Sequence, residues 1–218
     1  AKALVSEPEA RTTTSVCRER ASAATSAGVP STVTEAMLLA EIGRLNADPE
    51  VDAIIDTVIM PEAGEKTWHI VPGTTDQVGE GTVKVFNYTV EVEDGIDTAA
   101  FGGDEGFARM VTETLGNPKS WTHNPQFAFQ RIDASSPEIK PDFRVSLSSP
   151  MTVREGCGYE IPLESSCFNP VYGPDAQPRV FINEARWVRG AVPFQGDIGS
   201  YRQYLINHEV GHAIGYTT

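Results

Sequence analysis

The feature that most constrains this chain is a pair of histidines, His208 and His212, four residues apart near its end. Around them Ile206, Val210 and Ala213 recur at i, i+4 and i+7, which predicts a C-terminal α-helix with an apolar stripe facing the core. Residues four apart lie one helical turn apart on nearly the same azimuth, so both imidazoles can reach one point. Two histidines that merely decorate a helix remain the alternative interpretation.

Zinc is the ion that this spacing favours. It binds neutral imidazole nitrogen at about 2.0–2.1 Å and tolerates a tetrahedral site with one position left for water. Glu209 follows the first histidine and points about 100° away around the helix, so it can flank the ion without binding it. The sequence therefore predicts His208 and His212 as zinc ligands and Glu209 as the general base that takes a proton from a zinc-activated water.

Gly215 follows the second histidine at the point where the helix is expected to turn sharply away. The His-Glu-x-x-His-x-x-Gly run that ends at Gly215 resembles the zincin metallopeptidases and the start of the metzincin pattern. The chain from about Trp68 to Gly215 is also similar to a family of secreted bacterial zincin-like proteins that form a domain of unknown function. The similarity runs through Val92-Glu93-Asp94-Gly95, Asp142-Phe143-Arg144-Val145 and Asn207-His208-Glu209-Val210-Gly211-His212.

This resemblance implies a metzincin-like α/β (α+β) fold, in which a twisted mixed sheet lies above the zinc helix with a cleft between them. It implies a secreted hydrolase that cleaves the peptide bonds of a peptide or protein substrate. It also implies an exposed sheet edge that holds extended peptide, for which Val180–Asn183 is the nearest predicted strand.

The third zinc ligand is missing from the pattern. Metzincins place a histidine or aspartate three residues after the glycine, and here that position is Thr218, a poor ligand. No methionine-containing turn follows, so we expect either that the C-terminal part of the domain is missing or that another group completes the site. Two imidazoles alone hold zinc poorly, so we expect the chain as it stands to be metal-free or inactive unless another group completes the site. His69 and His123 are expected to lie on the surface. The alternative function is a non-catalytic zincin-fold binding or structural module.

The cysteines and the net charge limit the cellular locations and the binding partners that we expect for this protein. Cys157 and Cys167 flank a short loop that a disulfide could close, which favours a secreted or cell-envelope protein whose targeting segment is absent from this chain. Two free thiols are the alternative, and Cys17 has no predicted partner. The net charge of −13 argues against nucleic acid and anionic lipid as partners, and no apolar run is long enough to span a membrane.

Hydrophobic periodicity divides the chain into two parts. Residues 1–60 are predicted to be a tail or linker with one short helix over Thr32–Asn46, and residues 61–218 a zincin-like domain. We expect residues 149–178, rich in proline, to be an irregular surface excursion, and the second strand to contain a bulge or a twist. The predicted elements of the domain are strands at 67–71, 82–92, 126–132, 142–148 and 180–183, and helices at 104–115 and from about residue 200.

Overall fold

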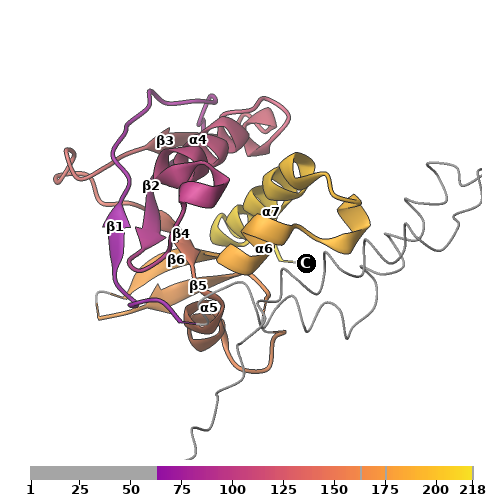
Figure 1. The fold of residues 1–218 in the computed structure, drawn as a ribbon. Coiled ribbons are helices and arrows are strands. Elements are labelled where there is room, and N and C mark those ends of the chain that lie inside the picture. The colour runs from indigo at the N-terminus through magenta and orange to yellow at the C-terminus, as the bar shows by residue number, and fades with distance from the viewer. Residues whose placement is uncertain (1–62, 163, 175, 218) are drawn as a thin grey trace, which may run out of the picture. The chain divides into compact units, whose positions relative to one another are not determined.

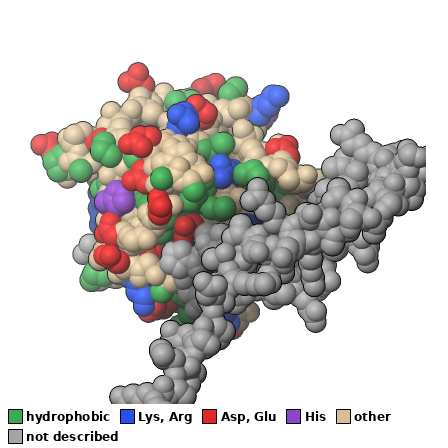
Figure 2. Space-filling view, in the orientation of Figure 1, with side chains coloured by type: hydrophobic (Ala, Val, Ile, Leu, Met, Phe, Trp, Pro, Cys, Tyr) green, Lys and Arg blue, Asp and Glu red, His purple; other side chains and the backbone are tan. Residues whose placement is uncertain are grey.

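The computed structural model describes residues 63–162, 164–174 and 176–217 (Figure 1). The predicted tail, its helix over Thr32–Asn46 and Cys17 therefore lie outside the described residues. Within the described part, no helix is long and apolar enough to cross a membrane. Acidic side chains are spread over the face that Figure 2 shows, in keeping with the net charge of −13.

One six-stranded sheet and the helices packed on it make up the described part of the chain. The strands are β1 (Trp68–Ile70), β2 (Lys84–Glu93), β3 (Phe127–Arg131), β4 (Phe143–Ser148), β5 (Cys167–Tyr172) and β6 (Gln177–Asn183). The helices are α4 (Gly103–Leu115), α5 (Pro150–Cys157), α6 (Glu184–Arg189) and α7 (Ile198–Ala213), with short 3-10 turns η1 (Ala99–Phe101), η2 (Trp121–His123) and η3 (Val192–Phe194). The prediction of an α/β domain with a C-terminal helix that carries both histidines is confirmed.

The sheet is mixed and its order is β1-β2-β4-β6-β5. The three central strands β2, β4 and β6 run parallel, while β1 and β5 pair antiparallel to their neighbours. The short strand β3 pairs parallel with the first half of β2. Parallel central strands buried by helices on their faces are typical of such sheets.

One face of the sheet forms the hydrophobic core with α4 and α7. Val90, Val145 and Val180 are neighbours across the three central strands and are fully buried. Helices α4 and α7 both pack against this layer (Figure 1). The helix residues in this core include Phe107, Val111, Leu115, Leu205, Ile206 and Val210. Burying each such side chain contributes about 1.5–3 kcal/mol, so this layer fixes α7 against the sheet.

The opposite face of the sheet is also buried. Ser146 is 0% exposed, and its hydroxyl accepts a hydrogen bond from Arg179 at 2.6 Å. Helix α5 packs on β5 and β6 at this face, where Gly156 lies against the ring of Phe181. Glu91, 1% exposed, accepts hydrogen bonds from Arg179 at 2.8 Å and from the Ser146 hydroxyl at 3.3 Å. Polar residues sit here because they satisfy one another, and alternation alone could not reveal the helix above them.

Residues 149–178 are not an irregular excursion, because they form α5 and β5. Pro150 occupies the first turn of α5, where its missing N–H costs nothing, and the buried carboxylate of Glu93 accepts from the Ser149 N–H at 2.7 Å. Pro170 lies inside β5, which is possible because β5 is an edge strand. The prolines that suggested a loop thus mark a helix start and a sheet edge.

Two further expectations about strands were wrong. The register of β2 is continuous along β3 and β4, so the predicted bulge is absent, and a register shift occurs instead between Asn169 and Tyr172 of β5. The apolar phase of β2 changes because the strand passes from a half-exposed to a fully buried environment. The strand over Val180–Asn183 is the end of β6, which lies between β4 and β5 and so offers no open edge.

Glu184, the first residue of α6, makes the stability of the fold depend on pH. It is 3% exposed, and its Oε2 has no hydrogen-bond partner among the described residues. Burial, and then the charges of Glu93 and Asp97, raise the pKa of Glu184 from 4.5 to about 7. Because the folded state binds this proton more tightly than the unfolded state, folding loses about 3 kcal/mol as the pH rises from about 4.5 through about 7.

We therefore expect Glu184→Gln to be more stable than the wild type at pH 8 and to lose this advantage at pH 4.5. Urea unfolding of both proteins at the two pH values measures the difference. A difference in unfolding free energy that stays constant with pH would contradict the assignment to this carboxyl group.

Candidate metal centre

Helix α7 carries the candidate site, and its start is set by a side-chain cap. Asp197 precedes the helix and accepts a hydrogen bond from the Ser200 N–H at 3.0 Å. The helix therefore begins at Ile198, slightly earlier than predicted. Leu205, Ile206 and Val210 bury one side of it against the sheet and α4, which leaves the adjacent side free to carry polar groups.

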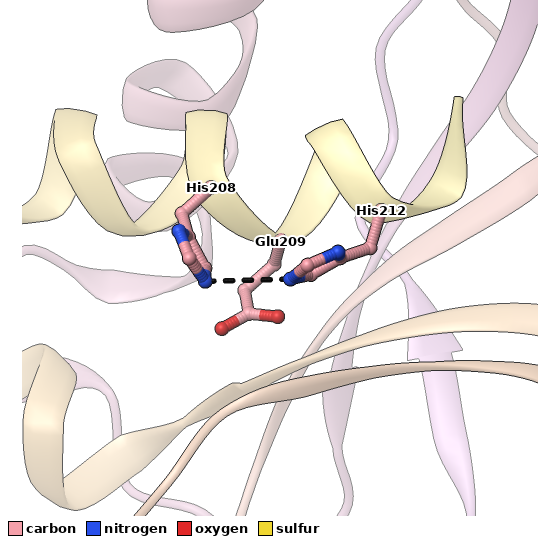
Figure 3. Close-up of side chains that lie close together, drawn as sticks. All are labelled: His208, Glu209 and His212. Atoms are coloured by element: carbon pink, nitrogen blue, oxygen red, sulfur yellow. Dashed lines mark hydrogen bonds between the residues drawn. The ribbon is translucent and has the colours of Figure 1, made fainter. Parts of the chain in front are cut away.

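The three predicted site residues lie together on the underside of α7 (Figure 3). The Nε2 atoms of His208 and His212 are 3.3 Å apart, and the Glu209 carboxylate hangs between the two rings. One ligand atom from each of the three residues lies within 4.8 Å of the others. The structure thus brings together the whole set that the sequence singled out.

The end of α7 orients the second histidine. Gly215 has a φ of +100°, and its N–H bonds to the His212 carbonyl at 3.1 Å, while the Tyr216 N–H bonds to the Gly211 carbonyl at 2.9 Å. This is a Schellman motif, which a glycine in the left-handed region allows. The turn brings the Tyr216 carbonyl within 2.9 Å of His212 Nδ1. A carbonyl only accepts, so Nδ1 carries the ring proton and Nε2 keeps its lone pair for a metal.

The spacing of the two imidazoles fits a tetrahedral ion. Two nitrogens bound at about 2.0–2.1 Å with a tetrahedral angle lie about 3.3–3.4 Å apart. The Nε2 atoms of His208 and His212 are already 3.3 Å apart. Burial, and then the charge of His212, lower the pKa of His208, which favours the neutral imidazole that a metal requires. The donor set therefore suits zinc.

Glu209 is a buried carboxyl group between the two histidines. It is 5% exposed, and no hydrogen bond from the described residues ends on its carboxylate. Burial raises the pKa of Glu209 from 4.5 to about 7. A carboxyl group with a pKa near neutrality can both take and return a proton under physiological conditions.

A cleft of about 470 Å³ opens onto these three residues. Its opposite wall is the beginning of β5, and its far end is the turn after α7. A cleft of this volume lies within the range of small-ligand sites. The residues that line it are Ser166, Cys167, Phe168, His208, Glu209, His212, Gly215, Tyr216 and Thr217.

Residues 55–218 match the family described as protein of unknown function (DUF3152). The chain belongs to this family. The matched range includes all of the described residues and therefore the whole candidate site. No curated protein and no solved structure matches the chain.

In this DUF3152 domain, the wall formed by β5 is tied to its surroundings. The predicted disulfide between Cys157 and Cys167 is present and joins the end of α5 to the first residue of β5. Closing a loop of this size stabilises the fold by about 2–3 kcal/mol. Just before β5, Glu164 pairs with Arg186 of α6 at 3.1 Å. One side of the cleft is therefore held by a covalent bond and a half-buried ion pair.

The remaining histidines of the DUF3152 domain lie apart from the centre. His69 bridges Asp94 at 2.7 Å and Asp104 at 2.9 Å, and these two hydrogen bonds raise the pKa of its imidazole, that of Asp104 most. It ties β1 to α4, whereas His123 is exposed at the end of η2. Neither belongs to the described group of possible metal ligands. The predicted third-ligand position, Thr218, lies outside the described residues.

Sequence reasoning missed the groups that surround the centre. Trp121 contacts α7 from a segment 86 residues earlier in the chain, and Tyr216 supplies its main-chain carbonyl. No local pattern reports a contact over such a separation. The glycine at position 215 was the one available signal, because it predicted the turn that places Tyr216.

Proposed function

We propose that this chain is a zinc-dependent peptidase domain, a hydrolase in which His208 and His212 hold the metal and Glu209 is the general base. The observation that carries the proposal is the pair of Nε2 atoms 3.3 Å apart above one buried carboxylate, at the floor of a cleft. The resemblance of the motif to the zincins supports it.

The chemistry divides between the metal and the protein. Bound zinc would polarise the scissile carbonyl and make water a stronger acid. Glu209 would take the proton of the attacking water and later deliver it to the leaving amine, because its carboxylate lies between the two ligands. His212 would donate its Nδ1–H to the Tyr216 carbonyl, so its Nε2 would remain available to bind a metal.

The wall of the cleft favours an extended peptide or protein substrate. β5 pairs with β6 on one side, and no described strand pairs with its other edge. Unpaired main-chain groups at a sheet edge can bind a peptide as an added strand. In this proposal β5, and not the strand over Val180–Asn183, holds the substrate beside Glu209.

The disulfide between Cys157 and Cys167 supports a secreted or cell-envelope location, because such bonds persist in oxidising compartments.

A zinc titration combined with a peptidase assay tests the proposal. The chain is freed of metal by chelation, titrated with zinc, and incubated with an unfolded polypeptide whose products are read by mass spectrometry. We expect zinc binding to saturate at one ion per chain, weakly because only two imidazoles of the described residues bind it, and new peptide termini to appear only with zinc. Zinc binding without hydrolysis would favour the non-catalytic zincin-fold module, and the absence of zinc binding would overturn the metal site.

A further inference from the structure

Trp121 touches the helix of the candidate centre at the residues that precede both ligands. Its Nε1 donates to the Asn207 carbonyl at 2.9 Å, one residue before His208. Its ring lies against Gly211, one residue before His212, so closely that a Cβ at position 211 would be 2.8 Å from Cζ2. The glycine in the motif is therefore required by this indole.

The same ring also holds the turn that follows α7. The rings of Trp121 and Tyr216 are stacked with centroids 4.6 Å apart and an interplanar angle of 30°. The Tyr216 carbonyl accepts the ring proton of His212 at 2.9 Å. Tyr216 is 44% exposed, and besides this stack its ring meets the edge of the Phe127 ring, with centroids 6.3 Å apart. The stack thus connects Trp121 to the orientation of one imidazole.

A neighbouring residue strengthens the contact. The Ser120 hydroxyl donates to Asn207 Oδ1 at 2.5 Å, and the Asn207 amide donates back to the Gln203 carbonyl at 3.0 Å. The segment around η2 therefore contacts α7 through hydrogen bonds at Asn207 and, one turn later, through packing of the indole ring against Gly211.

We propose that Trp121 is a positioning residue of the metal centre, which holds the Tyr216 turn against His212 so that the Nε2 of this histidine faces His208. The inference rests on the proposed function, because it takes the ligand of the two nitrogens to be zinc. Groups that orient a ligating histidine from behind commonly change metal affinity by about 10–100-fold when removed.

The test compares two substitutions of Trp121 with the same two at Trp68. Trp68 is a matched control because it also donates one indole hydrogen bond, to Ser148 at 3.0 Å, and packs against an aromatic ring on the far side of the sheet. Zinc dissociation constants are measured by competition with a chromophoric chelator. We expect Trp121→Ala to weaken zinc binding about 10–100-fold. Trp121→Phe, which keeps the stack and loses the N–H, should weaken it less, and both Trp68 variants should leave it unchanged.

A second measurement needs no metal. Nitrogen-15 spectra of the histidine rings in the metal-free protein, at a pH where they are neutral, report which nitrogen carries the proton. The wild type should show His212 protonated at Nδ1, and Trp121→Ala should lower this share while Trp68→Ala does not. Folded Trp121→Ala with unchanged zinc affinity and an unchanged tautomer would overturn the inference.

The outcomes separate the two proposals. A wild type that binds no zinc refutes the metal site, yet the tautomer spectra still decide whether Trp121 positions His212. If Trp121→Ala does not fold, Tyr216→Ala removes the same stack from the other side. Unchanged zinc affinity in folded Tyr216→Ala would then refute the role of the stack.

Discussion

We expect Glu209→Gln to lower the rate of the proposed peptide hydrolysis by about 10²–10⁴-fold, the usual contribution of a general base, and to leave zinc binding unchanged. The amide has nearly the same size as the buried carboxyl group, so packing in the cleft is preserved, but it cannot accept the proton of the attacking water. Steady-state kinetics on an unfolded polypeptide, together with elemental analysis of zinc, measure the two effects separately.

Glu184→Gln is the matched control for this prediction. Glu184 is also a buried carboxyl group with a pKa raised to about 7, but it lies on α6 and outside the candidate centre. Its amide variant should change stability and leave the hydrolytic rate unchanged. A Glu209→Gln protein that binds zinc and hydrolyses at the wild-type rate would remove Glu209 from the mechanism.

The acidic limb of the pH–activity profile should reflect the ionisation of Glu209. Only the ionised carboxylate of Glu209 can act as a base, so activity rises with pH as this group loses its proton. Its pKa of about 7 without metal sets the upper limit of the midpoint, because a nearby cation favours the carboxylate. We therefore expect the acidic limb of kcat/KM in the wild type to have its midpoint at or below about pH 7.

We expect His212→Ala to lower zinc affinity by at least about 100-fold, more than the loss of a group that only orients a ligand. The substitution removes one of two imidazole nitrogens that face each other at 3.3 Å, and it leaves the core stripe of α7 intact. Zinc titration in chelator-buffered solution measures the affinity, and thermal unfolding of the metal-free protein verifies that the fold is kept.

His123→Ala is the control for the ligand prediction, because this histidine is exposed and lies outside the described ligand group. It should bind zinc as the wild type does. Zinc binding by His212→Ala at wild-type strength would mean that the metal sits elsewhere on the chain.

The centre itself could be predicted from the sequence because all three of its residues lie within two turns of one helix. The spacing of His208 and His212 fixes their common azimuth through helix geometry alone. Glycine at position 215 likewise predicted the turn that ends the helix, and the positive φ there explains why. The proposed roles of these residues in metal binding and catalysis stay predictions until they are tested.

The surroundings of the centre could not be predicted in this way. Pro170 suggested a loop, yet it lies in β5, and only the order of the whole sheet makes β5 an edge that tolerates proline and walls the cleft. The sequence over Val180–Asn183 predicts a strand but does not show whether that strand lies at the edge or in the interior of the sheet. In the structure it lies in the interior.

Local periodicity therefore determined α4, α7, most strands and the candidate metal ligands, since these depend on contacts between near neighbours in the chain. Tertiary structure alone decided which strand borders the cleft, how deeply Glu209 is buried, and that Trp121 supports His212 through Tyr216. The physical reason is that strand order and ring packing join segments far apart in sequence, and no pattern within either segment records its partner.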